Sequence, residues 1–290
     1  MQIIITLATK KNYPIIHFPY LYPMNTTPNY LEINKKTWNE KVPVHVDSAF
    51  YDMEAFRAGK SSLKQIELTL LGDVRGKSIL HLQCHFGQDT ISLARMGARV
   101  TGIDLSDAAI LKANDLGAEL DVDARFICCD VYGLPKVLDE KFDIVFTSYG
   151  TIGWLPDMEK WAQVVAHFMK PGGSFVFAEF HPVVWMFDND LKYVQYSYFK
   201  AEPILETESG TYADREINTQ YSTMTWNHSI GEVFTALKKQ GLSIETLEEY
   251  DYSPYNCLAN MVQTGPDEYR IAHLNKLIPL VYAIKAHRKI

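Results

Sequence analysis

The 290-residue chain is poor in cysteine, and its four cysteines show none of the spacings that metal sites require. Cys84, Cys128, Cys129 and Cys257 lack zinc-ligand spacing, and their positions in predicted strands suit the reducing cytoplasm. His81, Cys84 and His85 lie close together, but strand alternation sends His81 and Cys84 to opposite faces. We therefore expect no metal centre and a cytoplasmic location.

The chain also lacks an excess of positive charge and any long apolar run. Its 28 basic and 35 acidic residues give a net charge of −7, whereas nucleic-acid-binding proteins usually present a basic face. The apolar run at residues 3–8 is too short to span a bilayer, and no positive charge precedes it as in a signal peptide. We expect no membrane segment, no targeting segment and no nucleic-acid partner, although a local basic patch stays open.

No internal repeat, low-complexity tract or linker rich in proline, glycine and serine divides the chain. With 47% hydrophobic residues, it can fold as one large α/β domain with insertions. Residues 1–23 differ in character from the rest and are interpreted as an extension, which leaves residues 24–290 as a single domain.

Residues 78–104 organise the remainder of the chain. A short apolar run at residues 78–83 is typical of a buried parallel strand, and an amphipathic helix follows from Asp89 and stops at Gly97. A second strand ends at Asp104. In such a βαβ unit, the turn at residues 84–89 and the Asp104 carboxylate lie at neighbouring strand ends, where open α/β sheets bind ligands.

This turn contains only one glycine, Gly87. A dinucleotide site requires G-x-G-x-x-G, so that a pyrophosphate can approach the helix N-terminus. Asp104, 17 residues after Gly87, is placed to accept both hydroxyls of a ribose. The pattern therefore favours S-adenosylmethionine over a dinucleotide.

Later segments carry a family resemblance. FDIVFTSYG at residues 142–150 and MKPGGSFVFAEF at 169–180 read as two more strands, with a helix that stops at Lys170 and a Pro-Gly-Gly turn between them. From about Tyr30 onward, the chain resembles the class I S-adenosylmethionine-dependent methyltransferases, in particular a bacterial branch with HLQCHFG in place of D-x-G-x-G-x-G. His81 then stands where the acid usually lies, and Gln83 and His85 stand where two glycines usually lie.

The resemblance implies a Rossmann-like, mostly parallel seven-stranded sheet with helices on both faces and an antiparallel last strand near residues 280–285. Asp104 would bind the ribose, and Asp130 with the backbone of Val131 would meet the adenine amino group, although Asp130 is also a plausible helix cap or turn residue. The full set of expected cofactor-binding residues is Gln83, Cys84, His85, Gly87, Asp104, Leu105, Asp130, Val131 and Ser148.

Two regions are expected to cover the site. Residues 24–76 read as helices broken at Pro43, and by resemblance they form a lid, with Trp38, His45 and Tyr51 as candidate lid residues. Residues 183–227 read as a small antiparallel insertion after the fifth strand, with strands at 192–199 and 219–226. Its aromatic side chains either line an acceptor pocket or pack the added sheet: Trp185, Tyr193, Tyr212 and Trp226.

Methyl transfer from a sulfonium is an in-line displacement, so the enzyme mainly aligns the acceptor and the methyl group in a dry pocket. If the acceptor is protonated, a general base is needed. His181 and His228 are candidates, each with a purely structural role as the equal alternative, and Tyr149 is a candidate polar positioning residue. We expect a small-molecule acceptor and a monomer or homodimer. The competing functions are an NAD(P)-dependent oxidoreductase and a non-catalytic S-adenosylmethionine-binding protein.

Overall fold

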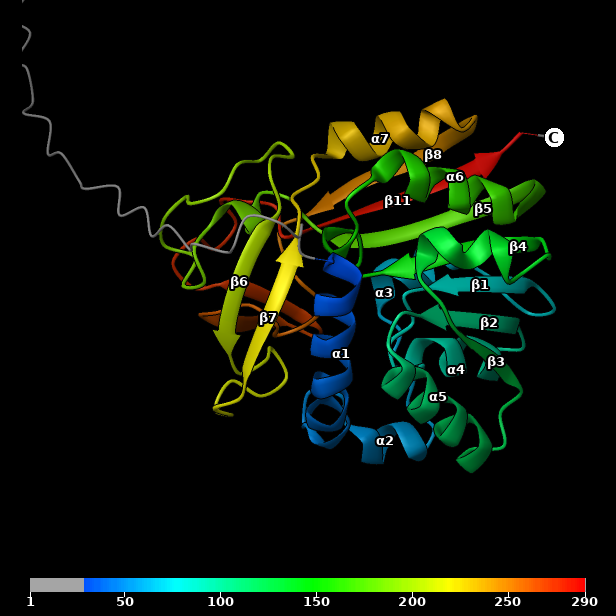
Figure 1. Ribbon diagram of the computed structural model, residues 1–290, viewed down its shortest axis with the longest axis horizontal. Helices are drawn as coiled ribbons and strands as arrows, with labels where there is room; N and C mark the ends of the chain where they lie inside the picture. The colour runs from blue at the N-terminus through cyan, green and yellow to red at the C-terminus, as the bar shows by residue number, and fades with distance from the viewer. Residues whose placement is uncertain (1–28, 290) are drawn as a thin grey trace, which may run out of the picture.

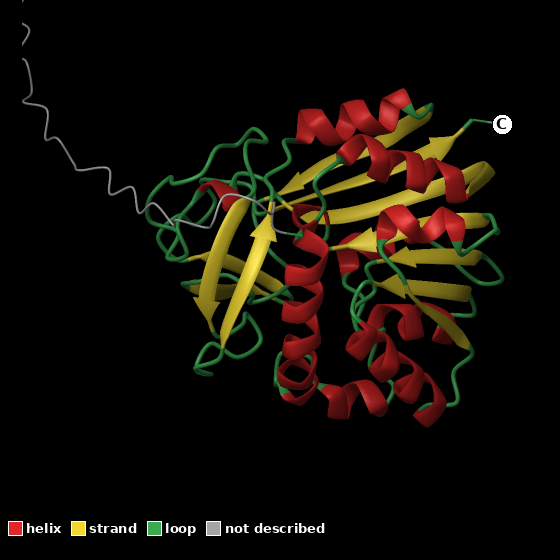
Figure 2. Ribbon diagram, viewed as in Figure 1, coloured by secondary structure: helices red, strands yellow, loops and turns green. Residues whose placement is uncertain are grey.

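The computed structural model describes residues 29–289. One seven-stranded sheet forms its centre, with strand order β3-β2-β1-β4-β5-β11-β8 (Figures 1 and 2). Its strands are β1 Ser78–Leu82, β2 Arg99–Asp104, β3 Ala124–Cys128, β4 Phe142–Ser148, β5 Met169–Phe180, β8 Leu242–Tyr250 and β11 Val281–Arg288. The helices are α1 Tyr30–Asp47, α2 Met53–Arg57, α3 Gln65–Leu71, α4 Gln88–Arg95, α5 Asp107–Glu119, α6 Met158–Phe168 and α7 Ile230–Lys239.

The sheet has the predicted mixed topology. β1 to β5 pair in parallel, and β11 lies antiparallel between β5 and β8. Successive residues of β1 enter different cores, as strand alternation requires: Leu80 packs under α6 and α7, whereas Ile79 packs with residues of α3 and α4. Helices on both faces and an antiparallel strand beside the fifth confirm the predicted fold class.

The predicted helix break at Pro43 is wrong. α1 continues through Pro43 to Asp47, although proline lacks the N–H that would donate within the helix. Tertiary contacts hold the helix in register: the Asn34 side chain donates to Met224 O and accepts from Met224 N, and the Thr37 hydroxyl donates to Ser222 O. These bonds attach α1 to β7 (Gln220–Thr225), which lies beside it in Figure 1.

The insertion after β5 contains one predicted strand and lacks the other. β7 lies within the predicted 219–226 segment, but it pairs with β6 (Ile204–Ser209) instead of residues 192–199. Residues 192–199 form turns, with one bridge from Val194 to Phe187. The alternating side chains of that segment do not bury one face of a strand, since the neighbouring residues Tyr193 and Val194 are both exposed. A second hairpin, β9 (Met261–Gly265) with β10 (Glu268–Ile271), was not predicted.

One smaller difference concerns the boundary between a helix and a strand, and one expectation lies outside the described residues. α6 ends at Phe168 and β5 begins at Met169, so Pro171, Gly172 and Gly173 lie inside a strand with a shifted register instead of in a turn between elements. A 3₁₀ helix, Val131–Lys136, follows β3 and contains Pro135. The proposed extension, residues 1–23, lies outside the described residues. Within residues 29–289, no helix is long and apolar enough to cross a bilayer.

Candidate functional site

A cavity of about 910 Å³ opens at the carboxyl ends of β1 to β4. We call it the central cavity. Its walls come from the turns after these strands, from α1 and from the β6–β7 hairpin, which Figure 1 shows on the far side of α1 from the sheet. All nine predicted cofactor-binding residues line it: Gln83, Cys84, His85, Gly87, Asp104, Leu105, Asp130, Val131 and Ser148. The tertiary structure thus brings together residues that are spread over 66 positions of the sequence, from 83 to 148.

The turn after β1 keeps a glycine-like backbone without the glycines. Gln83 and His85 have φ values of 57° and 50°, and Gly87 has a φ of 86°. Left-handed backbone costs a residue with a side chain roughly 1–2 kcal/mol. Both side chains are tied to neighbouring elements: Gln83 Nε2 donates to Thr151 O at 2.8 Å, and His85 Nε2 lies 3.0 Å from His45 Nδ1. These contacts offset part of the strain and fix the shape of the turn.

Asp104 is oriented by backbone donors at the end of β2. Its Oδ2 accepts the His85 N–H at 2.9 Å, and its Oδ1 accepts the Ser106 N–H at 2.8 Å. Burial raises the pKa of this carboxyl to about 6, and the backbone N–H groups oppose that rise. Each carboxylate oxygen retains further lone pairs, so Asp104 can still accept the two hydroxyls of a ribose.

Two further acceptors fit a polar ligand. Gln83 Oε1 is buried and has no hydrogen-bond partner in the described part of the chain, and a buried acceptor without a partner is energetically costly. Asp130 caps the 3₁₀ helix through its Oδ2, which accepts the Gly133 N–H at 2.9 Å. Asp130 therefore has the capping role that was its alternative interpretation, while it also lines the cavity. These carboxylate and amide oxygens are acceptors of the kind that ribose hydroxyls and an adenine amino group require.

The turn after β4 is also left-handed. Tyr149 has a φ of 41° and Gly150 one of 69°. The Tyr149 hydroxyl donates to Glu67 Oε2 at 2.8 Å, and burial raises the pKa of Tyr149 well above its usual value. Tyr149 lines the cavity as a neutral hydroxyl, which suits the predicted positioning role more than proton removal.

Glu179 was not predicted to be a site residue, yet it shapes this turn. Its carboxylate accepts N–H groups from Gly150, Thr151 and Ile152. Burial raises the Glu179 pKa, and these N–H groups oppose that effect. The sequence signal was its place at the end of the fifth strand, since strand ends share one sheet edge.

The lid residues divide into two layers. Trp38 and Tyr51 line the central cavity, whereas His45 is fully buried behind them and does not. Trp38 packs edge-on against His85, with ring centroids 5.2 Å apart. α1 therefore contacts the turn after β1 directly.

The predicted acceptor-side aromatics mostly reach the cavity. Trp185, Tyr212 and Trp226 line it, and the Tyr212 hydroxyl lies 2.5 Å from that of Tyr51 in the lid region. Tyr193 does not line it, and its side chain is 73% exposed. The predicted strand that would have directed Tyr193 inward is absent, which explains the difference.

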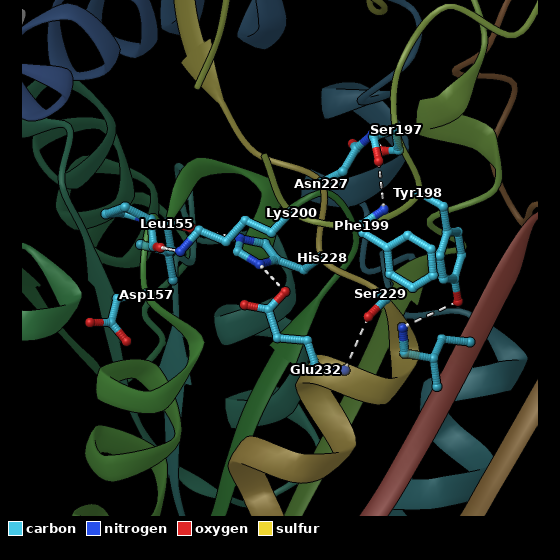
Figure 3. A network of polar contacts seen from close by, with 12 residues as sticks. Leu155, Asp157, Ser197, Tyr198, Phe199, Lys200, Asn227, His228, Ser229 and Glu232 are labelled. Carbon is cyan, nitrogen blue, oxygen red and sulfur yellow. Dashed lines mark hydrogen bonds and ion pairs between the residues drawn. The ribbon is translucent and has the colours of Figure 1, made fainter. Parts of the chain in front are cut away.

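Neither candidate histidine base lines the central cavity. His181 Nε2 lies 2.8 Å from Glu249 Oε1, and its Nδ1 accepts the Val183 N–H. His228 Nε2 lies 2.8 Å from Leu155 O, and its Nδ1 lies 3.1 Å from Glu232 Oε2 (Figure 3). Both ring nitrogens of each are engaged inside the protein, an arrangement that agrees with the structural role that was the alternative.

Other charged groups of the site carried no sequence signal. Lys41, Lys64 and Asp89 line the cavity. Glu67 lies beneath it, and burial raises its pKa to about 8. Residues 29–289 contain no group of three or more His, Cys, Asp and Glu side chains that could hold a metal ion.

Comparison with known proteins places this geometry in a family. Residues 79–173 match the family described as a methyltransferase domain. The ubiquinone biosynthesis O-methyltransferase of Alkalilimnicola ehrlichii is 33% identical over 108 residues, which are 37% of this chain and 43% of that protein. Phosphoethanolamine N-methyltransferase 1 of Triticum aestivum is 28% identical over 152 residues, which are 51% of this chain and 30% of that protein. The chain thus spans less than half the length of these relatives.

Solved structures share the fold at low identity. A Mesorhizobium loti S-adenosylmethionine-dependent methyltransferase matches with a TM-score of 0.51 and 20% identity over 84% of this chain and 100% of that one. The [4+2]-cyclase SpnF matches with a TM-score of 0.56 and 13% identity over 92% and 98% of the two chains. The sheet order and the strand-end cavity agree with these matches: residues 79–173 carry a methyltransferase domain, and the described chain has the fold of S-adenosylmethionine-dependent methyltransferases.

Proposed function

We propose that this protein transfers the methyl group of S-adenosylmethionine to a small-molecule acceptor. The observation that carries the proposal is the central cavity, which combines the strand-end residues expected to hold the cofactor with an aromatic wall from α1 and the insertion. Its 910 Å³ lies at the upper end of the roughly 300–1,000 Å³ typical of small-molecule sites. This volume has room for a cofactor and a second molecule.

Each side of the cavity would have a separate task. Asp104 would hold the ribose and Asp130 with Val131 the adenine, while Ser148 and the turn at residues 83–87 would hold the remainder of the cofactor. Once bound, S-adenosylmethionine supplies an electrophilic methyl group on sulfur. The protein would then orient the acceptor toward that methyl group and exclude water, which is the main contribution an enzyme makes to an in-line displacement.

Proton removal by His181 or His228 finds no support in the geometry, because neither side chain reaches the cavity. Tyr149 would position a polar acceptor group. We propose that a protonated acceptor loses its proton either to another group of the same acceptor molecule or to solvent. A cytoplasmic protein that acts as a monomer or homodimer agrees with this function.

Both alternative functions stay distinguishable by experiment. Nothing in the comparisons favours an oxidoreductase, but the fold also serves a [4+2]-cyclase, so it does not by itself define the reaction. The test is incubation with methyl-labelled S-adenosylmethionine and a metabolite extract, followed by identification of labelled products by mass spectrometry. Asp104→Ala protein serves as the control. Tight binding of S-adenosylhomocysteine with no labelled product from any extract would favour the non-catalytic alternative.

A further inference from the structure

Lys41 is a buried cation without a carboxylate partner. It lies in α1, is only 7% exposed and lines the central cavity. Its Nζ is 5.3 Å from the ring centroid of Tyr221, 5.4 Å from that of Trp38 and 5.9 Å from that of Trp154. Within residues 29–289 it makes neither a hydrogen bond nor an ion pair, so three aromatic rings are its immediate surroundings.

The other basic side chains of the cavity wall are all engaged. Lys60 pairs with Asp52 at 3.0 Å, and Lys64 pairs with Asp267 at 2.9 Å. Arg215 donates to Leu258 O at 2.6 Å. Lys41 differs from them in that its ammonium has no protein acceptor within the described residues, and it is also the most buried of the three lysines in this wall.

An unpaired buried ammonium is unfavourable. Aromatic faces attract a cation, but they do not replace the hydrogen bonds that water provides. Burial accordingly lowers the Lys41 pKa, and the more distant Glu208 opposes that effect. An anion that entered the cavity beside Lys41 would supply the missing acceptor and relieve this cost.

The position of Lys41 assigns such an anion to the acceptor side of the cavity. Tyr221 belongs to β7, and Glu208 belongs to β6, so the ammonium faces the hairpin of the insertion. Asp104 and Asp130 instead follow β2 and β3, at the edge of the central sheet. The Trp38 ring contacts both Lys41 and His85 of the turn after β1.

We propose that the methyl acceptor carries a carboxylate or phosphate group that binds the Lys41 ammonium, with the aromatic rings of Trp38 and Trp154 against its apolar part. This inference rests on the proposed function and adds the substrate class. Acceptors whose corresponding group is cationic are excluded, because they would place a second positive charge beside an ammonium that is already desolvated.

The test uses simple anions as probes, because no acceptor has to be known. Binding of benzoate and of phenyl phosphate to the full chain, saturated with S-adenosylhomocysteine, is measured by calorimetry, with benzyl alcohol and benzylamine as neutral and cationic analogues. We expect at least one anion to bind more tightly than both analogues. The better of the two anions distinguishes a carboxylate from a phosphate acceptor.

Lys41→Met should weaken that anion by roughly tenfold or more while leaving benzyl alcohol unchanged, as the loss of a charge-assisted bond predicts. Lys60→Met is the matched control, since it removes a lysine of the same cavity wall that is already paired, and it should keep the anion affinity. Lys41→Met should also melt at the same temperature as the wild type or higher, because it removes an unpaired buried charge. Lys41→Gln provides a second uncharged variant, in which we expect the same loss of anion affinity.

Equal anion affinity in the wild-type and Lys41→Met proteins would overturn the inference, and so would wild-type protein that prefers neither anion to the alcohol. Loss of S-adenosylhomocysteine binding in Lys41→Met would overturn it as well, because the lysine would then serve the cofactor's own carboxylate. Failure of the wild type to bind S-adenosylhomocysteine would instead contradict the proposed function, and the two failures are separate measurements.

Discussion

His45 Nδ1 lies 3.0 Å from His85 Nε2, which joins the domain's first described helix to the turn that is expected to hold the cofactor. Burial lowers the pKa of His45 to about 3, and burial together with His45 and Lys41 lowers the pKa of His85 well below its usual value. The pair is therefore neutral near pH 7, with one imidazole donating to the other. This bond couples α1 to the left-handed backbone at His85.

His45→Leu is expected to destabilise the protein by about 1–3 kcal/mol, because it leaves His85 Nε2 without its partner. The same change in a His85→Gly background should cost less, since glycine adopts the positive φ without strain and has no ring to satisfy. Urea unfolding of the four proteins gives the coupling energy. Strictly additive costs would show that the two rings do not stabilise one another.

Asp104→Ala should weaken binding of S-adenosylhomocysteine by about 2–3 kcal/mol, since a carboxylate that accepts two hydroxyls makes charge-assisted bonds. Calorimetry measures the change, and unaltered affinity would remove Asp104 from the site. The pKa of about 6 adds a pH dependence. The affinity of the wild-type protein for S-adenosylhomocysteine should fall as the pH drops below 6, because the protonated carboxyl is a weaker acceptor. Asp104→Asn should remove this pH dependence.

Glu67→Gln should change how stability depends on pH. In the folded protein the Glu67 pKa is raised from 4.5 to about 8, so the folded state holds a proton that the unfolded chain has released between those values. The stabilisation from the neutral form is therefore complete below about pH 4.5 and is lost as the pH rises toward 8, at up to roughly 1.4 kcal/mol per pH unit.

Melting temperatures of the wild type, Glu67→Gln and the exposed-site control Glu202→Gln should be compared from pH 5 to pH 9. The amide introduced by Glu67→Gln keeps an acceptor for the Lys64 N–H, whose bond to Glu67 Oε1 is 2.6 Å long. We expect the decline above pH 6 to be shallower in Glu67→Gln than in either other protein. Parallel profiles in all three would contradict a neutral Glu67.

Trp185→Ala and Tyr193→Ala form a matched pair within the insertion. Trp185 is 38% exposed but lines the central cavity and packs edge-on against Phe180, with ring centroids 5.8 Å apart, whereas Tyr193 is 73% exposed and does not line the cavity. Once a labelled product identifies the acceptor, Trp185→Ala should lower turnover with little change in cofactor affinity, because it removes an acceptor-side surface. Tyr193→Ala should match the wild type, and equal losses in both would contradict a specific role for Trp185.

Hydrophobic patterning in the sequence was enough to predict the central sheet. Each of the parallel strands is a short apolar run, and the helices between them carry apolar stripes, so local periodicity already determines the βαβ order. Residues at the ends of those strands, such as Asp104 and Ser148, could be placed at one sheet edge because right-handed crossovers leave only one arrangement. That reasoning predicted the cofactor side of the cavity.

Tertiary structure decided how the insertion lines the cavity and what surrounds the candidate histidines. Pro43 is tolerated within α1 because side chains of α1 bond to the backbone of distant β7, which no local pattern encodes. His181 follows β5 and His228 precedes α7, but distant groups hold both rings: Glu249 contacts His181, and Leu155 O contacts His228. Lys41 and Glu67 look like ordinary surface residues of amphipathic helices in the sequence, and only long-range packing desolvates them. Burial is a property of the assembled chain, so charge states and open binding partners emerge with the tertiary structure.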